Sequence, residues 1–261
     1  MLDRLTIERM TAEAGEGPIL IALSGGGDSV ALLHLLAETL GAHRLHAAVV
    51  DHALRDGSAA DADRARGFAE ALGVSATKLT LTWPDGPKRA QHYARIARYA
   101  ALCNEARRIG ARLIATGHTR DDQAETVLLR AARGSGWRGL AGMRALAPAP
   151  VWPAGRDVRL ARPLLRTRRA ALRETLFSRR ATWIEDPANT NTDFARVRAR
   201  AQLGQMECAG LDPMRLAALA ERLRPHADDL DRGALALIET SAAFEGDLII
   251  LDLGAWRASA V

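Results

Sequence analysis

The feature that most constrains this chain is a glycine-rich stretch near its N-terminus, Ser24-Gly25-Gly26-Gly27-Asp28-Ser29. It follows the apolar run 18–23, typical of a short buried strand, and precedes the apolar run 30–36, typical of a helix. A glycine turn between a strand and a helix directs backbone N–H groups and the positive end of the helix dipole toward one point, which suits a phosphate group. The stretch lacks the Gly-Lys-Ser/Thr ending of a Walker A loop and the Gly-x-Gly-x-x-Gly pattern of dinucleotide-binding folds. It therefore predicts an anion-binding loop of another kind, made by Ser24, Gly25, Gly26, Gly27, Asp28 and Ser29.

Strand-like and helix-like segments alternate over the first half of the chain. We expect strands at 19–23, 45–50, 76–83 and 113–116, and helices at 28–40, 58–72, 89–109 and 121–133. Ser58 is the expected N-cap of the second helix. This order predicts an α/β fold with a mostly parallel sheet and helices on both faces. In such sheets ligands bind beyond the carboxyl ends of the strands, near a switch in strand order.

The second half of the chain is predominantly helical in pattern. We expect a loop over 145–157, a strand at 158–161, a helix at 167–180 and a polar loop at 188–193, then helices to Arg232 with breaks at Gly210 and Pro225. The run 248–253 resembles one strand of a sheet that the chain does not complete. We therefore predict a catalytic domain over 1–185, followed by a small, mainly helical C-terminal region over 186–261.

Several protein classes are disfavoured by composition. No run of about 18 apolar residues is present, which argues against a membrane span, and the N-terminus lacks the long apolar core of a secretory signal. The two cysteines, Cys103 and Cys208, form no metal-ligand spacing and favour a reducing compartment. We expect a cytoplasmic protein.

Charge is distributed unevenly along the 261 residues, whose net charge is +5. Residues 130–200 hold 16 arginines, no lysine and 5 acidic residues, a local charge of +11, so the remainder carries −6. Arginine replaces lysine almost everywhere, which indicates genome composition, whereas the asymmetry indicates a polyanionic partner such as RNA. Replacing Arg166, Arg168 and Arg169 should weaken the binding of such a partner and flatten its salt dependence.

A second polar cluster follows the fourth expected strand and enters a helix. Asp121, Asp122 and Glu125 lie at helical spacing, so their carboxylates share one face. Acids in a first turn also complement the helix dipole, which is the structural alternative. Three acids beside an anion-binding loop favour magnesium binding or the gripping of an ammonium group. His118 by itself is more often a hydrogen-bonded loop histidine than a catalytic one.

Weaker signals come from three further stretches. His52 and Arg55 follow the second strand, and polar residues commonly end strands. Arg95 and Arg98 share a helix face that is either solvated or bound to an anion. Arg133 begins a flexible basic loop, which could clamp phosphates or simply turn the chain.

Taken together, these motifs resemble the N-type ATP pyrophosphatases, or PP-loop proteins, and among them the tRNA(Ile)-lysidine synthases. The resembling stretches are spread over about two thirds of the chain: 24–29, 50–55, 94–99, 117–126, 133–143, 162–165 and 183–200. Three positions depart from the family pattern. Thr119 stands where a second histidine is usual, Gln91-His92-Tyr93 lacks the usual glutamate, and Arg196-Val197-Arg198-Ala199-Arg200 lacks the usual asparagine and isoleucine.

The resemblance implies an adenine nucleotide alpha hydrolase-like fold and a two-step reaction. ATP, bound on Ser24–Ser29 with Mg²⁺ on Asp28 and Asp122, adenylates the 2-carbonyl oxygen of the wobble cytidine in the CAU anticodon of tRNA(Ile). The ε-amine of free L-lysine then displaces AMP. The implied catalytic residues are Asp28, Asp122, Glu125 and Arg98, with Asp122 the first choice as base. The implied substrate and tRNA contacts are His52, Arg55, His118, Arg133, Arg196 and Arg200. The C-terminal region would contact tRNA, and a homodimer is one possible assembly.

Three other functions compete with this interpretation. A tRNA thiolase would share the ATP step but usually needs a reactive cysteine pair or a cluster-binding Cys-x-x-Cys, and this chain has neither. An amidating synthetase leaves the basic segment unexplained. A non-catalytic nucleotide-binding or tRNA-binding module would not need Asp28, Asp122 and Glu125 together.

Overall fold

A six-stranded sheet forms the centre of the computed structural model, which describes residues 2, 4–83, 91–185, 195–245 and 248–254. The strand order is β3-β2-β1-β4-β6-β5. The strands are β1 (Ile19–Ala22), β2 (Leu45–Asp51), β3 (Ser75–Thr80), β4 (Leu113–Ala115), β5 (Leu146–Pro148) and β6 (Arg159–Ala161). Pairings among β1, β2, β3, β4 and β6 are parallel, and β5 pairs antiparallel with β6. The predicted mostly parallel sheet is confirmed.

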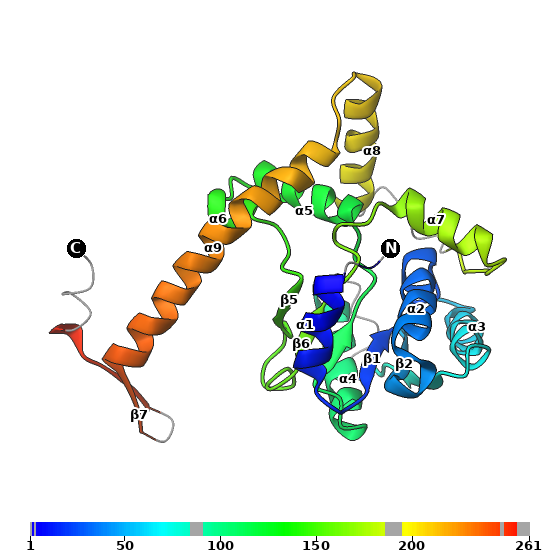
Figure 1. Ribbon diagram of the computed structural model, residues 1–261, viewed down its shortest axis with the longest axis horizontal. Helices are drawn as coiled ribbons and strands as arrows, with labels where there is room; N and C mark the ends of the chain where they lie inside the picture. The colour runs from blue at the N-terminus through cyan, green and yellow to red at the C-terminus, as the bar shows by residue number, and fades with distance from the viewer. Residues whose placement is uncertain (1, 3, 84–90, 186–194, 246–247, 255–261) are drawn as a thin grey trace.

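Helices cover both faces of this sheet, as predicted (Figure 1). The helices are α1 (Arg4–Ala14), α2 (Gly27–Leu40), the 3-10 turn η1 (Ala42–Arg44), α3 (Ser58–Glu70), α4 (Gln91–Arg108), α5 (Arg120–Ala132), α6 (Trp137–Leu140), α7 (Arg169–Ser178), α8 (Ala195–Cys208) and α9 (Met214–Ser241). Ile19 and Ile21 of β1 pack with α1, α2, α3 and α7, whereas Leu20 packs with α4. Successive side chains of a strand point to opposite faces, so one buried strand serves both cores.

The strand order reverses between β1 and β4. The chain moves outward from β1 through β2 to β3, and then returns to place β4 on the other side of β1. The glycine-rich loop follows β1, and the segment beginning at Gly117 follows β4. These two loops therefore meet at the switch point, where sheets of this kind bind ligands.

The last two helices pack on α5 at one end of the sheet. Ala124 of α5 shares a small apolar cluster with Leu203 of α8 and with Met214 and Ala217 of α9. Beyond this contact α9 extends away from the sheet and ends in the hairpin of β7 (Ala242–Glu245) and β8 (Leu248–Leu251) (Figure 1). Within the described residues, no helix is long and apolar enough to span a membrane.

Four local predictions were wrong. Pro225 lies inside α9 and does not break it, because the Arg224 guanidinium anchors this part of the helix on the Gly142 carbonyl at 2.9 Å. Gly57, with φ of +81°, is the N-cap of α3 in place of Ser58. The expected loop 145–157 contains β5, and the tail strand has its partner in β7. The predicted break at Gly210 is confirmed, whereas the polar loop 188–193 lies outside the described residues.

Candidate active site

The glycine-rich loop between β1 and α2 is held in shape by its own hydrogen bonds. The Ser29 hydroxyl donates to the Gly26 carbonyl at 2.8 Å and accepts from the Ser24 backbone N–H at 3.2 Å. Gly25 has φ of +82°, and a Cβ there would lie 2.7 Å from the Ile184 side chain. The Ile184 N–H donates to the Gly25 carbonyl at 2.9 Å, which fixes the outer side of the loop. The loop thus presents a preformed helix N-terminus of the kind that binds anions.

The segment after β4 lies directly against this loop. A Cβ on Gly117 would lie 2.9 Å from the Asp28 carbonyl oxygen and 3.0 Å from the Ser29 nitrogen, so the two backbones touch. Two residues further on, Thr119 caps α5 through a capping box. Its N–H and its hydroxyl donate to Asp122 Oδ2 at 2.8 and 2.7 Å, and the Asp122 N–H returns a bond to the hydroxyl at 3.3 Å. This cap fixes the position of the Asp122 carboxylate.

Three predicted acids converge at the switch point on one arginine. Arg169 Nε donates to Asp28 Oδ2 at 2.9 Å, and its Nη2 donates to Asp122 Oδ1 at 3.0 Å. Its Nη1 lies 3.6 Å from Glu125 Oε1, which also accepts from Arg200 Nε at 2.9 Å. We call Asp28, Asp122 and Glu125 the carboxylate cluster. Its members come from α2 and α5, and its cations come from α7 and α8.

The three carboxylates have different proton affinities. Burial raises the pKa of Asp28, and Arg169 offsets this only in part. Burial and the neighbouring Asp122 likewise raise the pKa of Glu125 against the pull of Arg200 and Arg169. At Asp122 burial is outweighed by Arg169 and by the hydrogen bonds from Thr119, so the pKa is lowered. Asp122 is therefore the most firmly ionised of the three, and Glu125 is the better proton acceptor.

Among the described residues, two buried oxygens of the cluster have no hydrogen-bond partner: Asp28 Oδ1 and Glu125 Oε2. Both oxygens of Asp122, by contrast, are engaged. Unpartnered carboxylate oxygens are the ligands that Mg²⁺ and ammonium groups take, so the site fits a small cation at Asp28 better than at Asp122. Within the described residues no group of three or more metal-ligating side chains occurs. A magnesium ion there would take its other ligands from phosphate and water.

Other predicted residues surround the cluster. Asp121 does not share the cluster's face, because its Oδ2 accepts from the Arg169 N–H at 2.8 Å and so caps the start of α7. His118 interacts electrostatically with Asp122, and its Nδ1 lies 2.8 Å from the Thr116 hydroxyl. Burial lowers the pKa of His118 to about 3, so the imidazole is neutral at pH 7. Arg98 of α4 lies 5.0 Å from the centre of the Tyr99 ring, and its positive charge helps to lower the pKa of His118.

Four predicted contact residues lie outside this cluster. Arg55 pairs with Asp61 of α3. His52 follows β2, and its carbonyl accepts from the Trp83 indole at 2.8 Å. Arg133 is the C-cap of α5, about 20 Å along the helix from its N-terminus. Arg196, at the start of α8, is exposed and lines a pocket described below.

Sequence reasoning missed the roles of Arg169 and Arg173. Arg169 was expected on an RNA-binding surface, yet its side chain is only 22% exposed and carries the ion pairs of the carboxylate cluster. The Arg173 guanidinium would touch a Cβ on Gly27 at 2.9 Å, so it lies against the glycine-rich loop. The spacing of these two arginines does place them on one helical face. Only the fold shows that this face turns toward the site.

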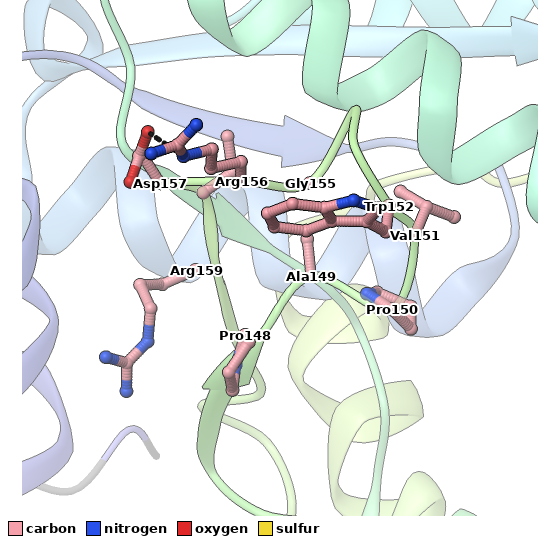
Figure 2. Close-up of a pocket in the computed structure, with 10 residues that line it drawn as sticks. Pro148, Ala149, Pro150, Val151, Trp152, Gly155, Arg156, Asp157 and Arg159 are labelled. Atoms are coloured by element: carbon pink, nitrogen blue, oxygen red, sulfur yellow. Dashed lines mark ion pairs between the residues drawn. The ribbon is translucent and has the colours of Figure 1, made fainter. Parts of the chain in front are cut away.

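A pocket of about 580 Å³ lies at the edge of the sheet opposite to the carboxylate cluster (Figure 2). It is formed by the connection from β5 to β6, between Pro148 and Arg159. Trp152 lies across it and is 77% exposed. This pocket contains none of the predicted site residues.

The fold and the glycine-rich loop are those of PP-loop proteins, and a family model described as a PP-loop domain matches residues 3–207. Among similar proteins, the tRNA(Ile)-lysidine synthase of Hyphomonas neptunium is 46% identical over 189 residues, covering 71% of this chain and 50% of the relative. That of Bradyrhizobium sp. is 43% identical, covering 85% and 63%, and that of Methylobacterium nodulans is 38% identical, covering 90% and 68%. The chain belongs to the tRNA(Ile)-lysidine synthase family. It spans half to about two thirds of the length of these relatives.

A solved structure has the same fold. The U34-tRNA thiolase of Methanococcus maripaludis, described with its [4Fe-4S] cluster, superimposes with a TM-score of 0.66 at 18% identity. The match covers 85% of this chain and 80% of the thiolase. At this identity the likeness concerns the fold alone.

Proposed function

We propose that this chain ligates free lysine to C2 of the wobble cytidine of tRNA(Ile) with the CAU anticodon, at the expense of ATP. The observation that carries the proposal is the carboxylate cluster, in which acids from the N-terminal turns of α2 and α5 converge on Arg169 beside the glycine-rich loop. Membership of the tRNA(Ile)-lysidine synthase family supports the choice of amine and RNA.

In the first step, the phosphates of ATP bind on Ser24–Ser29 at the N-terminus of α2. The helix dipole and the loop N–H groups stabilise the negative charge of the departing pyrophosphate. Asp28, through its unpartnered Oδ1, would hold Mg²⁺, which neutralises phosphate charge when it is bound. The cytidine O2 attacks the α-phosphorus, and pyrophosphate leaves. Arg173, beside Gly27, adds positive charge on the side of the loop formed by α7.

In the second step, the lysine ε-amine attacks C2 of the adenylated base, and AMP leaves. The carboxylate cluster already surrounds a guanidinium, so its charge and geometry suit a second side-chain cation. The amine must lose a proton to complete the attack. We assign this proton to Glu125, in preference to Asp122, because Glu125 has the raised pKa and an unpartnered Oε2. Asp122, both of whose oxygens are engaged, then serves to hold Arg169.

The thiolase alternative is weakened by the two cysteines. Cys103 belongs to α4 and its side chain is buried in the core, and burial raises the pKa of its thiol to about 11, which disfavours the nucleophilic thiolate. Cys208 lies at the end of α8 and is exposed. These two thiols lie in different parts of the fold, so they do not form a reactive pair.

The decisive experiment incubates the full chain with ATP, Mg²⁺, labelled lysine and tRNA. We expect label in tRNA(Ile) bearing CAU and none in tRNA(Met), which shares the anticodon. Asp28→Asn should abolish pyrophosphate release while tRNA binding stays close to that of the parent chain. The matched control is Asp63→Asn, an exposed acid of α3 outside the site. Failure of well-folded protein to label tRNA(Ile) would refute the ligase function.

We further propose that residues 186–261 contribute to tRNA binding as a separate C-terminal region, and that the protein acts in the cytoplasm. A homodimer remains a prediction, which sedimentation at several protein concentrations tests.

A further inference from the structure

A second pocket, of about 380 Å³, is lined mainly by arginines. They come from five helices, from the residue after β6 and from the loop before β5: Arg95 of α4, Arg130 of α5, Arg138 of α6, Arg196 of α8, Arg224 of α9, Arg162 and Arg144. We call this the arginine pocket. Asp231 is the single acid among the described residues that line it.

The carboxylates near the arginine pocket neutralise only one side of it. Asp231 pairs with Arg138 and Arg144, and Asp228 lies 2.8 Å from Arg144 and 3.3 Å from Arg224. The other four arginines of the pocket have no carboxylate partner within the described part of the chain: Arg95, Arg130, Arg162 and Arg196. The pocket therefore carries a concentrated and uncompensated positive charge.

Because part of the pocket is buried, its positive charge is energetically unfavourable when no anion is bound. Arg162 is only 8% exposed and donates a hydrogen bond to the Arg144 carbonyl at 2.8 Å, and its buried Nε has no partner in the described part of the chain. Burial, together with Arg95, Arg130 and Arg196, lowers the pKa of its guanidinium. Arg130 donates to the carbonyls of Gly139 and Gly142. Buried arginines are ordinarily paired, so this arrangement indicates that an anion supplies the missing charge.

The arginine pocket is separate from the glycine-rich loop Ser24–Ser29. The loop follows β1, His118 follows β4, and Arg162 follows β6, so the pocket lies beyond the β4 segment, on the side away from the loop. It adjoins the carboxylate cluster through α5, because Thr126 lines the pocket and its hydroxyl donates to the Asp122 carbonyl at 2.7 Å. The anion it holds is therefore distinct from the pyrophosphate of the first step.

We propose that the arginine pocket binds a backbone phosphate of the RNA, adjacent to the nucleotide whose base enters the carboxylate cluster. This inference rests on the proposed function. Arg95 and Arg196 are exposed at the pocket, whereas Arg162 is buried, so a phosphodiester can enter while its flanking nucleotides stay in solvent. Guanidinium groups match phosphate oxygens in a bidentate manner. A phosphate fixed here would hold the splayed cytidine in register with the site.

The test compares tRNA(Ile) binding by the full chain with that of Arg95→Ala, Arg196→Ala and the double variant, measured by filter binding at several salt concentrations. Each single change should weaken binding at low salt roughly tenfold. The double variant should lower the slope of log K against log salt by about 0.7–0.9, the value for one lost phosphate contact. Arg112→Ala, an exposed arginine before β4 at the opposite edge, is the matched control and should behave as the parent chain.

The outcomes separate this inference from the function on which it rests. If the parent chain ligates lysine but the pocket variants keep its affinity and salt slope, the pocket does not bind RNA. If the variants weaken inhibition by inorganic pyrophosphate and leave tRNA affinity unchanged, the pocket binds a free phosphate, and the inference is overturned. If the double variant shows the expected change of salt slope but the parent chain incorporates no lysine, the proposed role of the pocket is supported and the ligase function is refuted.

Discussion

At the scale of single residues, Arg169 stabilises the ionised form of the carboxylate cluster. Three acids this close would repel one another and take up protons, because burial alone raises the pKa of a carboxyl group. Arg169 lies between them and contacts each one. The cluster therefore keeps oxygens available for a ligand without losing its negative charge.

We expect Arg169→Gln to destabilise the fold by about 2–4 kcal/mol at pH 7, because it leaves buried carboxylates unpaired. The lowered pKa of Asp122 contributes stability above the ordinary aspartate pKa, and this is lost as the pH falls through the folded-state value. Without Arg169 that contribution disappears. The difference in unfolding free energy between variant and parent should therefore be largest at neutral pH and decrease below about pH 5. Urea unfolding at several pH values measures it.

Arg169→Lys is the control for this prediction, since it keeps the charge and loses the planar fork. It should recover part of the stability at pH 7. A loss that is equal at all pH values would mean that Arg169 acts through packing, and not through its charge.

The sequence identified the members of the cluster but not their partners. Motif spacing brought Asp122 and Glu125 beside the glycine-rich loop that contains Asp28, whereas Arg200 was predicted only from the family resemblance. Arg169 and Asp121 were misassigned, since both belong to helix termini whose contacts are long-range. Side-chain partners across 47 or 141 residues of sequence depend on packing that no local pattern contains.

At the scale of elements, the contact between the β4–α5 turn and the start of α2 determines the site. Gly117 permits this contact, because any side chain there would meet the backbone of Asp28 and Ser29. The capping box of Thr119 then fixes α5 in direction and Asp122 in position.

Gly117→Ala should therefore separate the two loops. We expect a loss of stability of about 1–3 kcal/mol, as for overpacking of a tight contact, and a larger fractional loss of pyrophosphate release than of tRNA binding. Thermal unfolding and the two activity assays measure these effects. Gly67→Ala in α3 is the control, because a Cβ there meets nothing within 4 Å and should stabilise the helix by about 0.5–1 kcal/mol. Equal behaviour of the two variants would contradict the importance of the contact.

Elements with strong periodicity were predictable, and short ones were not. The strands and helices from β1 to α5 follow the predicted order because apolar periodicity and glycine stops mark each one. The three residues of β5 carry no periodic signal, and their pairing with β6 is a tertiary effect. The predicted helix break at Pro225 was wrong for the same reason. Packing of α9 on the rest of the protein stabilises a helix that local propensity alone would end at this proline.

At the scale of the whole molecule, α9 has two unequal halves. Its first part packs on α5 and α8 through an apolar cluster. Its second part extends from the body and carries a hairpin whose strands pair with each other (Figure 1). The uneven charge of the sequence predicted a basic region, but its convergence from α4, α5, α8 and α9 into one pocket required the fold.

A chain ending after Ser241 should keep the stability of the body, because the hairpin contributes no strand to the main sheet. We expect its Tm to lie within about 2 °C of that of the full chain, with lysine ligation retained. A chain ending at Pro213 should unfold or aggregate, because removal of α9 exposes Ala124 and Leu203. Calorimetry of the two truncations distinguishes them, and a large loss in the first would show that the hairpin supports the body.

The ion pair between Asp28 and Arg169 joins residues 141 positions apart, and that between Glu125 and Arg200 joins residues 75 positions apart. During synthesis the phosphate loop leaves the ribosome long before the cations that complete its site. A nascent chain that stops short of α7 has the loop and the acids but lacks Arg169, and one that stops short of α8 also lacks Arg200. Because these two arginines arrive late, the carboxylate cluster gains both of its cations only once nearly the whole region matched by the PP-loop family model has been made.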